Sequence, residues 1–353
     1  MAAGENYRPT PTESPTVVTP EHNDVISADN YDRLFPTDNL RMQEDPIIDI
    51  QYSPAGKYII AARESGLYVY DAKNYSLFKM IPLIGMRKPA QMANKPDLAI
   101  QPNGELIAVL TEDNVQVLSW YSGDTIWTHE GPYADGVFSP DGQTLVLIVP
   151  ATPERNTEFS MFEFWSSTSW TLIRQFEGQP FATWDPVYSA DGSLLVVGGA
   201  GIKVYTSDGQ WITTTFGSDV SAGYTLDVAV SPVDNLIAEL SISEAYLRIW
   251  RFPKSGYPVL SRRITLPDWV FDGELAFSPY GTRLAVGVND RVILYDTSSW
   301  NQVPLDDSVF DNPTSDPGFV TGLIWSPDGA TLLGFSNTGV LRVWNALNGE
   351  VVK

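Results

Sequence analysis

Short runs of alternating apolar and polar residues follow one another along most of this chain, and one arrangement of such runs returns seven times. In each unit, a first run ends on a bulky apolar residue, a turn follows, and a second apolar run begins, as in FSPDGQTLVLIV at 138–149. Period-2 patterning with many β-branched and aromatic residues predicts β-strands. No long segment carries an apolar stripe at helical spacing, so we expect an all-β protein.

A four-residue turn motif separates the first and second strands of each unit. Proline presets φ early in such a turn, Asp or Asn fits the next position, and Gly accepts the positive φ at its end. The copies lie 38 to 50 residues apart, and a period of this size marks a repeat architecture. They are SPAG (Ser53), QPNG (Gln101), SPDG (Ser139), SADG (Ser189), SPVD (Ser231), SPYG (Ser278) and SPDG (Ser326).

Each unit continues with a third strand that ends on an aromatic residue and a fourth strand after a short turn. Third strands include LYVYD (67–71), LRIWR (247–251) and LRVWN (341–345), and fourth strands include LFKMI and TLIRQF. One four-stranded unit cannot bury both of its faces, but seven units stacked around an axis can. We therefore expect a seven-bladed β-propeller of four-stranded antiparallel blades.

The same residues resemble those of the WD-repeat family over roughly 38–353. The turn motif, the period and the Trp-Asp-like strand ends carry this resemblance; the ends are Tyr70-Asp71, Tyr295-Asp296 and Trp344-Asn345. The family's Gly-His pair is missing, since His22 and His129 are the only histidines. Degenerate repeats behind a Pro/Thr-rich tail resemble bacterial secreted or cell-surface WD-like propellers. The resemblance implies a scaffold that binds other proteins.

We expect the chain to consist of an N-terminal tail and one propeller domain. Residues 1–37 form a disordered, Pro/Thr-rich tail with a short helical turn at 27–34, and residues 38–353 form the propeller. A terminal strand must complete the last blade. We expect NLRMQ (39–43) to take part, with GEVVK (349–353) competing for the same edge.

The composition and net charge limit which partners and which metal or disulfide chemistry the protein can have. A net charge of −21 and a pI near 4.3 disfavour nucleic acid as a partner. With no cysteine, disulfides and Cys-ligated zinc are excluded. We expect no transmembrane segment and, in the sequence as given, no signal peptide. We expect a monomer that acts outside the cell or on its surface; the alternative is the cytoplasm.

An acidic residue stands four positions before the turn serine in six of the seven units. A ring of such carboxylates could bind a cation or a basic peptide. The alternative, which repetition at one position favours, is that each carboxylate caps a local turn by accepting backbone N–H groups. The six residues of this acidic ring are Asp49, Asp97, Asp135, Asp185, Asp227 and Glu274, and Gly322 takes the seventh place.

The loops that enter the first strands and those that join strands two and three should share one face of a propeller. Several are long, and loops on a rigid scaffold often carry function. Aromatic residues and arginine are the usual anchors of protein interfaces, although these aromatics could instead fill the seams between blades. The candidate partner-binding residues are Arg87, Lys88, Phe181, Trp184, Trp269 and Phe271.

Catalytic and metal sites have little support. His22 lies in the tail and His129 near the end of an outer strand, so no Ser-His-Asp triad is apparent. The loop at 304–319, with Asp306, Asp307, Asp311 and Asp316, matches no EF-hand spacing and reads as a solvated acidic loop. We expect no cofactor or resident metal. The aromatics that follow the third strands should belong to the core between blades; they are Tyr75, Trp127, Trp170, Trp211 and Trp300.

The predicted function is a non-catalytic scaffold that binds a protein or peptide on the loop face of a WD-like propeller. The alternative is a hydrolase or lyase that uses carboxylates on a propeller face, with or without Ca²⁺. That alternative requires a paired set of acids, and no motif in the sequence selects one.

Overall fold

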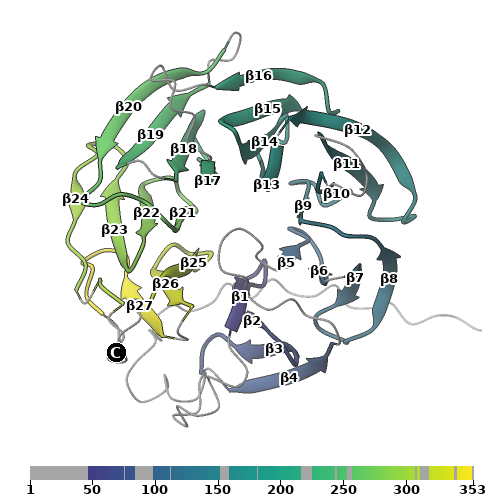
Figure 1. Ribbon diagram of the computed structural model, residues 1–353. Coiled ribbons are helices and arrows are strands. Elements are labelled where there is room, and N and C mark those ends of the chain that lie inside the picture. The colour runs from purple at the N-terminus through teal and green to yellow at the C-terminus, as the bar shows by residue number, and fades with distance from the viewer. Residues whose placement is uncertain are drawn as a thin grey trace, which may run out of the picture.

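The computed structural model shows a closed ring of seven antiparallel sheets around a central axis (Figure 1). The predicted seven-bladed β-propeller is therefore confirmed. The structure describes residues 47–74, 76–83, 98–111, 113–151, 159–180, 182–215, 225–242, 245–252, 257–306, 308–310, 318–337 and 340–351. No helix occurs within these ranges. The expected tail at 1–37, its helical turn and the strand at 39–43 lie outside them.

The first four blades follow the chain in order. Blade 1 has β1 (Ile47–Tyr52), β2 (Tyr58–Arg63), β3 (Gly66–Asp71) and β4 (Leu77–Pro82). Blade 2 has β5 (Leu98–Ile100), β6 (Leu106–Leu110), β7 (Asn114–Ser119) and β8 (Thr125–Glu130). Blade 3 has β9 (Asp135–Phe138), β10 (Thr144–Val149), β11 (Phe159–Ser166) and β12 (Leu172–Pro180). Blade 4 has β13 (Ala182–Tyr188), β14 (Leu194–Gly199), β15 (Ile202–Thr206) and β16 (Trp211–Thr215).

The last three blades complete the ring. Blade 5 has β17 (Thr225–Val230), β18 (Leu236–Ser241), β19 (Tyr246–Arg251) and β20 (Val259–Thr265). Blade 6 has β21 (Gly273–Phe277), β22 (Arg283–Val288), β23 (Arg291–Asp296) and β24 (Gln302–Val303). Blade 7 has β25 (Val320–Trp325), β26 (Thr331–Ser336) and β27 (Leu341–Asn345). In every blade the first strand is innermost, and β1 lies beside β25 where the ring closes (Figure 1).

The fourth-strand position of blade 7 is taken by the C-terminal segment. Val351 forms an antiparallel bridge with Trp344 of β27, and the Asn345 N–H donates to the Glu350 carbonyl at 2.9 Å. Residues 349–351 of the competing GEVVK segment thus occupy this edge, and residues 39–43, the other expected closing strand, are not among those described.

The serine turn has the conformation that the sequence predicts, and the serine hydroxyl adds hydrogen bonds that the sequence did not predict. The Ser326 Oγ accepts the Thr331 N–H at 2.9 Å and donates to the Asp328 carboxylate at 2.5 Å, so it links both sides of the hairpin. Gly329 closes the turn at φ 66°, a conformation that glycine adopts without steric cost. The same serine-to-backbone bond occurs at Ser53, Ser139, Ser189 and Ser278.

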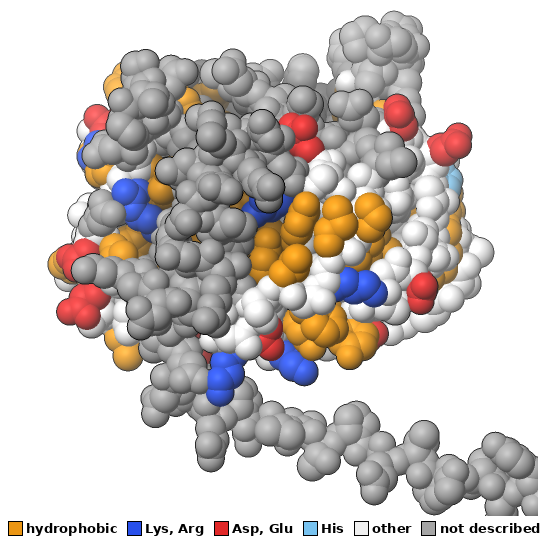
Figure 2. All heavy atoms as spheres, turned by 90° about the horizontal axis from the view of Figure 1, so that it is seen from below, with side chains coloured by type: hydrophobic (Ala, Val, Ile, Leu, Met, Phe, Trp, Pro, Cys, Tyr) orange, Lys and Arg blue, Asp and Glu red, His pale blue; other side chains and the backbone are white. Residues whose placement is uncertain are grey.

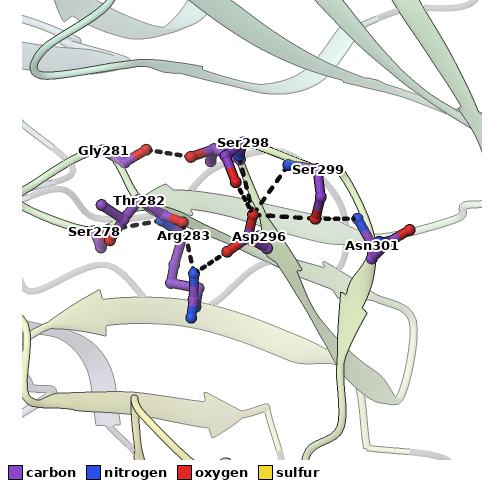
Figure 3. A network of polar contacts seen from close by, with 9 residues as sticks. Ser278, Gly281, Thr282, Arg283, Asp296, Ser298, Ser299 and Asn301 are labelled. Carbon is purple, nitrogen blue, oxygen red and sulfur yellow. Dashed lines mark hydrogen bonds and ion pairs between the residues drawn. The ribbon is translucent and has the colours of Figure 1, made fainter.

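A polar side chain at the end of the third strand caps the next turn, and Figure 3 shows the case of Asp296. Its carboxylate accepts the backbone N–H groups of Ser298 and Ser299 at 3.1 and 3.0 Å. It also pairs with the guanidinium of Arg283. These bonds, the Ser298 hydroxyl foremost, hold the pKa of Asp296 well below its usual range. The Trp-Asp-like strand ends are therefore turn caps.

Seven buried apolar clusters fill the described part of the core, one at each seam between neighbouring blades. Trp127 and Trp170 pack at the seam of blades 2 and 3, and Trp300 packs at that of blades 5 and 6, as expected. Trp211 does not, because more than half of its surface is exposed. At the seam of blades 3 and 4, Phe176 packs against Tyr205, with ring centroids 5.5 Å apart. Tyr75 lies outside the described residues.

Candidate functional site

The loop between β20 and β21 presents two large aromatic side chains to solvent. Trp269 is 62 % exposed and Phe271 is 53 % exposed, whereas Val270 between them is fully buried. Alternation of this kind anchors the loop through one residue and turns its two neighbours outward. These two predicted partner-binding residues do not fill a seam between blades.

Asn289, in the turn between β22 and β23, fixes the backbone of this loop. Its Oδ1 accepts the Phe271 N–H at 2.9 Å, and its Nδ2 donates to the Trp269 carbonyl at 2.8 Å. Asn289 itself has φ 52°, a conformation in which asparagine is several-fold enriched. The loop entering the first strand and the turn joining strands two and three thus meet on one face, as predicted.

Charged side chains border the aromatic pair. Arg291 lies between two carboxylates, with its Nη2 3.6 Å from Asp268 Oδ2 and its Nε 3.5 Å from Asp290 Oδ1. Asp272 adds a third carboxylate, whose oxygen accepts the Gly273 N–H at 2.9 Å. The surface around Trp269 and Phe271 is therefore apolar at its centre and net negative at its border.

The other predicted partner-binding residues are not brought together in the described structure. Trp184 lies on β13, where it pairs in register with Gly198. Arg87, Lys88 and Phe181 lie outside the described residues. Sequence reasoning also missed Asn289, whose only signal was an Asn-Asp pair between two strands.

The acidic ring connects neighbouring blades. Asp49 Oδ2 accepts the N–H of Leu98 in blade 2 at 3.1 Å. Asp135 likewise accepts from the N–H of Asp185 in blade 4, and Asp227 from the N–H of Leu275 in blade 6. Asp135 and Asp227 are buried. These carboxylates accept backbone N–H groups, which agrees with the capping role predicted as the alternative to a cation or peptide site. Besides the local bonds of Asp49 and Asp135, they also accept N–H groups across the seam between blades.

Asp185 and Glu274 are the other described members of the ring. Asp185 has φ 52°, and Glu274 is half-buried on β21. Asp97 lies outside the described residues. Gly322 replaces the acid in blade 7 because a Cβ there would lie 2.1 Å from the buried ring of Phe335. Within the described ranges, no group of three or more His, Asp or Glu side chains is placed to hold a metal ion.

The acidic loop at 304–319 is partly anchored. The buried ring of Phe310 packs against Trp344, and the Trp344 Nε1 donates to the Asp306 carbonyl at 2.7 Å. Asp307, Asp311 and Asp316 are not described.

Comparison with known proteins agrees with this architecture. Residues 308–345 match the family model described as "WD domain, G-beta repeat". Among solved structures, the chain is similar to the β-propeller domain of Cps50 (Swd1) from Myceliophteria thermophila, with a TM-score of 0.66 and 13 % identity over 85 % of this chain and 96 % of that one. No curated protein matches the sequence. The two matches support a WD-repeat β-propeller.

WD-repeat propellers are typically non-catalytic scaffolds for protein interactions. The matched stretch covers β25 to β27 and includes the SPDG turn at Ser326, one of the two identical copies of this motif. At 13 % identity the similarity to the solved structure concerns the fold alone. Among the described residues, no helix is long and apolar enough to cross a bilayer.

Proposed function

We propose that this WD-repeat propeller is a non-catalytic scaffold that binds a protein or peptide partner on its loop face, centred on Trp269 and Phe271. The observation that carries the proposal is the exposed pair on a backbone held by Asn289 and Val270. A preorganised loop loses little conformational entropy on binding. Aromatic side chains near the centre of an interface typically contribute most of its affinity.

The carboxylates at the border narrow the class of partner. Asp268, Asp272 and Asp290 outnumber Arg291 around the pair. A partner segment with lysine or arginine beside an apolar or aromatic residue would complement this surface, since opposite potentials attract and favour the correct partner. We also propose that the protein acts outside the cell or on its surface, on the basis of its Pro/Thr-rich first 24 residues.

The test compares proteins captured from the source organism by the full chain and by three single variants. Trp269→Ala and Phe271→Ala should each lose the captured partner. Tyr280→Ala is the matched control, because Tyr280 is 62 % exposed, like Trp269, but lies in the serine turn of blade 6. A partner retained by both loop variants, or lost equally in the control, would refute this site.

A further inference from the structure

The outer edge of blade 1 is an apolar strand. β4 is the last strand of its sheet, and no described strand pairs with its outer side. Leu77 is 51 % exposed, Phe78 is 46 % exposed, and Met80 is also exposed. Figure 2 looks onto this rim and shows hydrophobic side chains gathered there, with Lys or Arg side chains among them.

Other outer strands carry charged or polar residues along their edges. Charged side chains on an edge strand hinder pairing with another chain. β12 has Arg174 and Glu177, β20 has Arg262 and Arg263, and β16 is rich in threonine. β4 has one charged residue among its six, so its backbone edge is well suited to accept a further strand.

The single charged residue of β4 is turned toward blade 2. Lys79 Nζ donates to the Tyr121 carbonyl at 3.2 Å and also to the Ser122 carbonyl. Gly123 makes room for it, because a Cβ there would lie 3.2 Å from this Nζ. Lys79 therefore attaches β4 to blade 2, and its ammonium is not directed over the edge.

An ordered aromatic surface adjoins the same strand. The Phe78 ring lies 5.0 Å from that of Tyr58 and stacks on that of Tyr121 at 5.6 Å. Tyr58 is buried and Tyr121 is exposed. A bound segment would find this surface already formed, so little ordering would be needed on binding.

The charge of blade 1 differs from that of the whole chain. Residues 47–83 contain four basic and three acidic side chains, whereas the chain has a net charge of −21. Lys57 and Lys73 are exposed beside the turn that leads into β4, and the Ala72 N–H donates to the Lys57 carbonyl at 2.8 Å. The net charge of −21 disfavours a second copy of the whole chain by repulsion. At short range, the ammonium groups of Lys57 and Lys73 would instead attract the carboxylates of a bound segment, because more distant surface charges are screened by salt.

We propose that β4 is a second docking surface, which takes an extended acidic segment of a partner protein as an additional strand of blade 1. Backbone hydrogen bonds along β4 supply the pairing. Apolar side chains of the segment contact Leu77, Phe78 and Met80, and its carboxylates lie near Lys57 and Lys73. This surface lies on the rim and is separate from Trp269 and Phe271, so it acts independently of the loop face.

The test uses a fluorescent peptide of alternating glutamate and valine as the probe, with the full chain and fluorescence anisotropy. Two control peptides accompany it: one with lysine in place of glutamate, and one with alternate backbone nitrogens methylated, which cannot pair along that edge. We expect the acidic peptide to bind, and Met80→Glu to weaken binding about tenfold or more, the equivalent of about 1.4 kcal/mol. The matched variant Ile173→Glu adds the same charge to the exposed surface of β12 and should change binding less than about twofold.

Binding of the methylated peptide to the wild-type protein tests the backbone pairing directly. This comparison does not depend on whether any variant folds. Equal binding of methylated and parent peptides, stronger binding of the lysine peptide, or no binding of the acidic peptide would each overturn the proposal. So would a dimer in light scattering that Met80→Glu abolishes, because the occupant of the edge would then be a second copy.

Discussion

Lys203 lies in an environment that disfavours its charged form. It lies on β15, its side chain is almost fully buried, and its Nζ donates to the Ala200 carbonyl at 2.7 Å. Burial lowers its pKa from 10.5 to about 8. A lysine whose pKa is lower in the folded state opposes folding at every pH below the folded value.

Lys203→Met should therefore stabilise the protein below pH 8. One pKa unit corresponds to about 1.4 kcal/mol, and part of the gain is lost with the bond to Ala200, so we expect about 1 to 3 kcal/mol. The difference should shrink as the pH rises from 8 to 10.5, because the unfolded lysine is still protonated there while the folded one is not. Urea unfolding of both proteins across this range measures it. A difference that is constant with pH would contradict this account.

Ser189 and Asp191 allow a second residue-scale prediction. The Ser189 hydroxyl and the Ser193 N–H lower the pKa of Asp191 from 3.8 to about 2. A carboxylate with a lowered pKa contributes stability above its unfolded pKa and loses it as the pH falls toward the folded value.

Ser189→Ala should cost about 1 kcal/mol at neutral pH, since the Leu194 N–H also loses its acceptor. The cost should fall between pH 3.8 and pH 2 as the Asp191 carboxylate is protonated in wild type. Thermal melts of both proteins through this range test the prediction. A cost that does not change with pH would show that the serine acts without the carboxylate.

At the scale of elements, an asparagine in the turn between strands two and three makes the same kind of hydrogen bond in two blades. Asn289 fixes the loop before β21, and Asn337, in the turn after β26, accepts the Phe319 N–H at 2.8 Å before β25. In both blades a side-chain amide ties the turn between strands two and three to the entry of the innermost strand. Loop conformation on this face is thus set by pairs of turns and not by either turn alone.

Asn289→Gly separates the conformational role of this residue from its bonding role. Glycine accepts the φ of 52° but removes the three side-chain hydrogen bonds to the loop. We expect a loss of about 1 to 2 kcal/mol and faster proteolysis near Trp269. Asn337→Gly is the matched control, which should destabilise the protein without exposing the 267–272 loop to protease. Equal cleavage in wild type and both variants would show that the side chain of Asn289 is not needed to hold the loop.

At the scale of the whole molecule, the acidic ring joins consecutive blades through residues about 50 positions apart. The bonds from Asp49, Asp135 and Asp227 span 49, 50 and 48 residues. With one apolar cluster at each seam and β1 beside β25, every blade packs on two neighbours. A closed ring of this kind should unfold as one cooperative unit.

Asp227→Ala should lower the free energy of unfolding by about 2 to 3 kcal/mol, because the Leu275 N–H loses a charged acceptor at a buried seam. Asp71→Ala, which removes an exposed cap within one blade, should cost about 1 kcal/mol or less. Calorimetry should show one transition for both variants. A second transition in Asp227→Ala would mean that blades unfold separately.

The sequence by itself determined the repeat, the strand order within a blade and the turns. These depend on local dihedral preferences and on period-2 patterning, which neighbouring residues carry, as in Ser326-Pro327-Asp328-Gly329. It also selected Trp269 and Phe271, because a polar loop with two aromatics stands out against an alternating pattern.

Only the tertiary structure decided what these parts do together. Acids of the inner strands bond across seams, Gly322 is small because Phe335 fills its space, and Trp211 is exposed although its counterparts Trp127, Trp170 and Trp300 pack at seams. Asn289 acts on a loop that precedes it by some 20 residues. Each of these contacts joins residues from separate strands or blades. Local preferences cannot predict such contacts, since they exist only once the ring has closed.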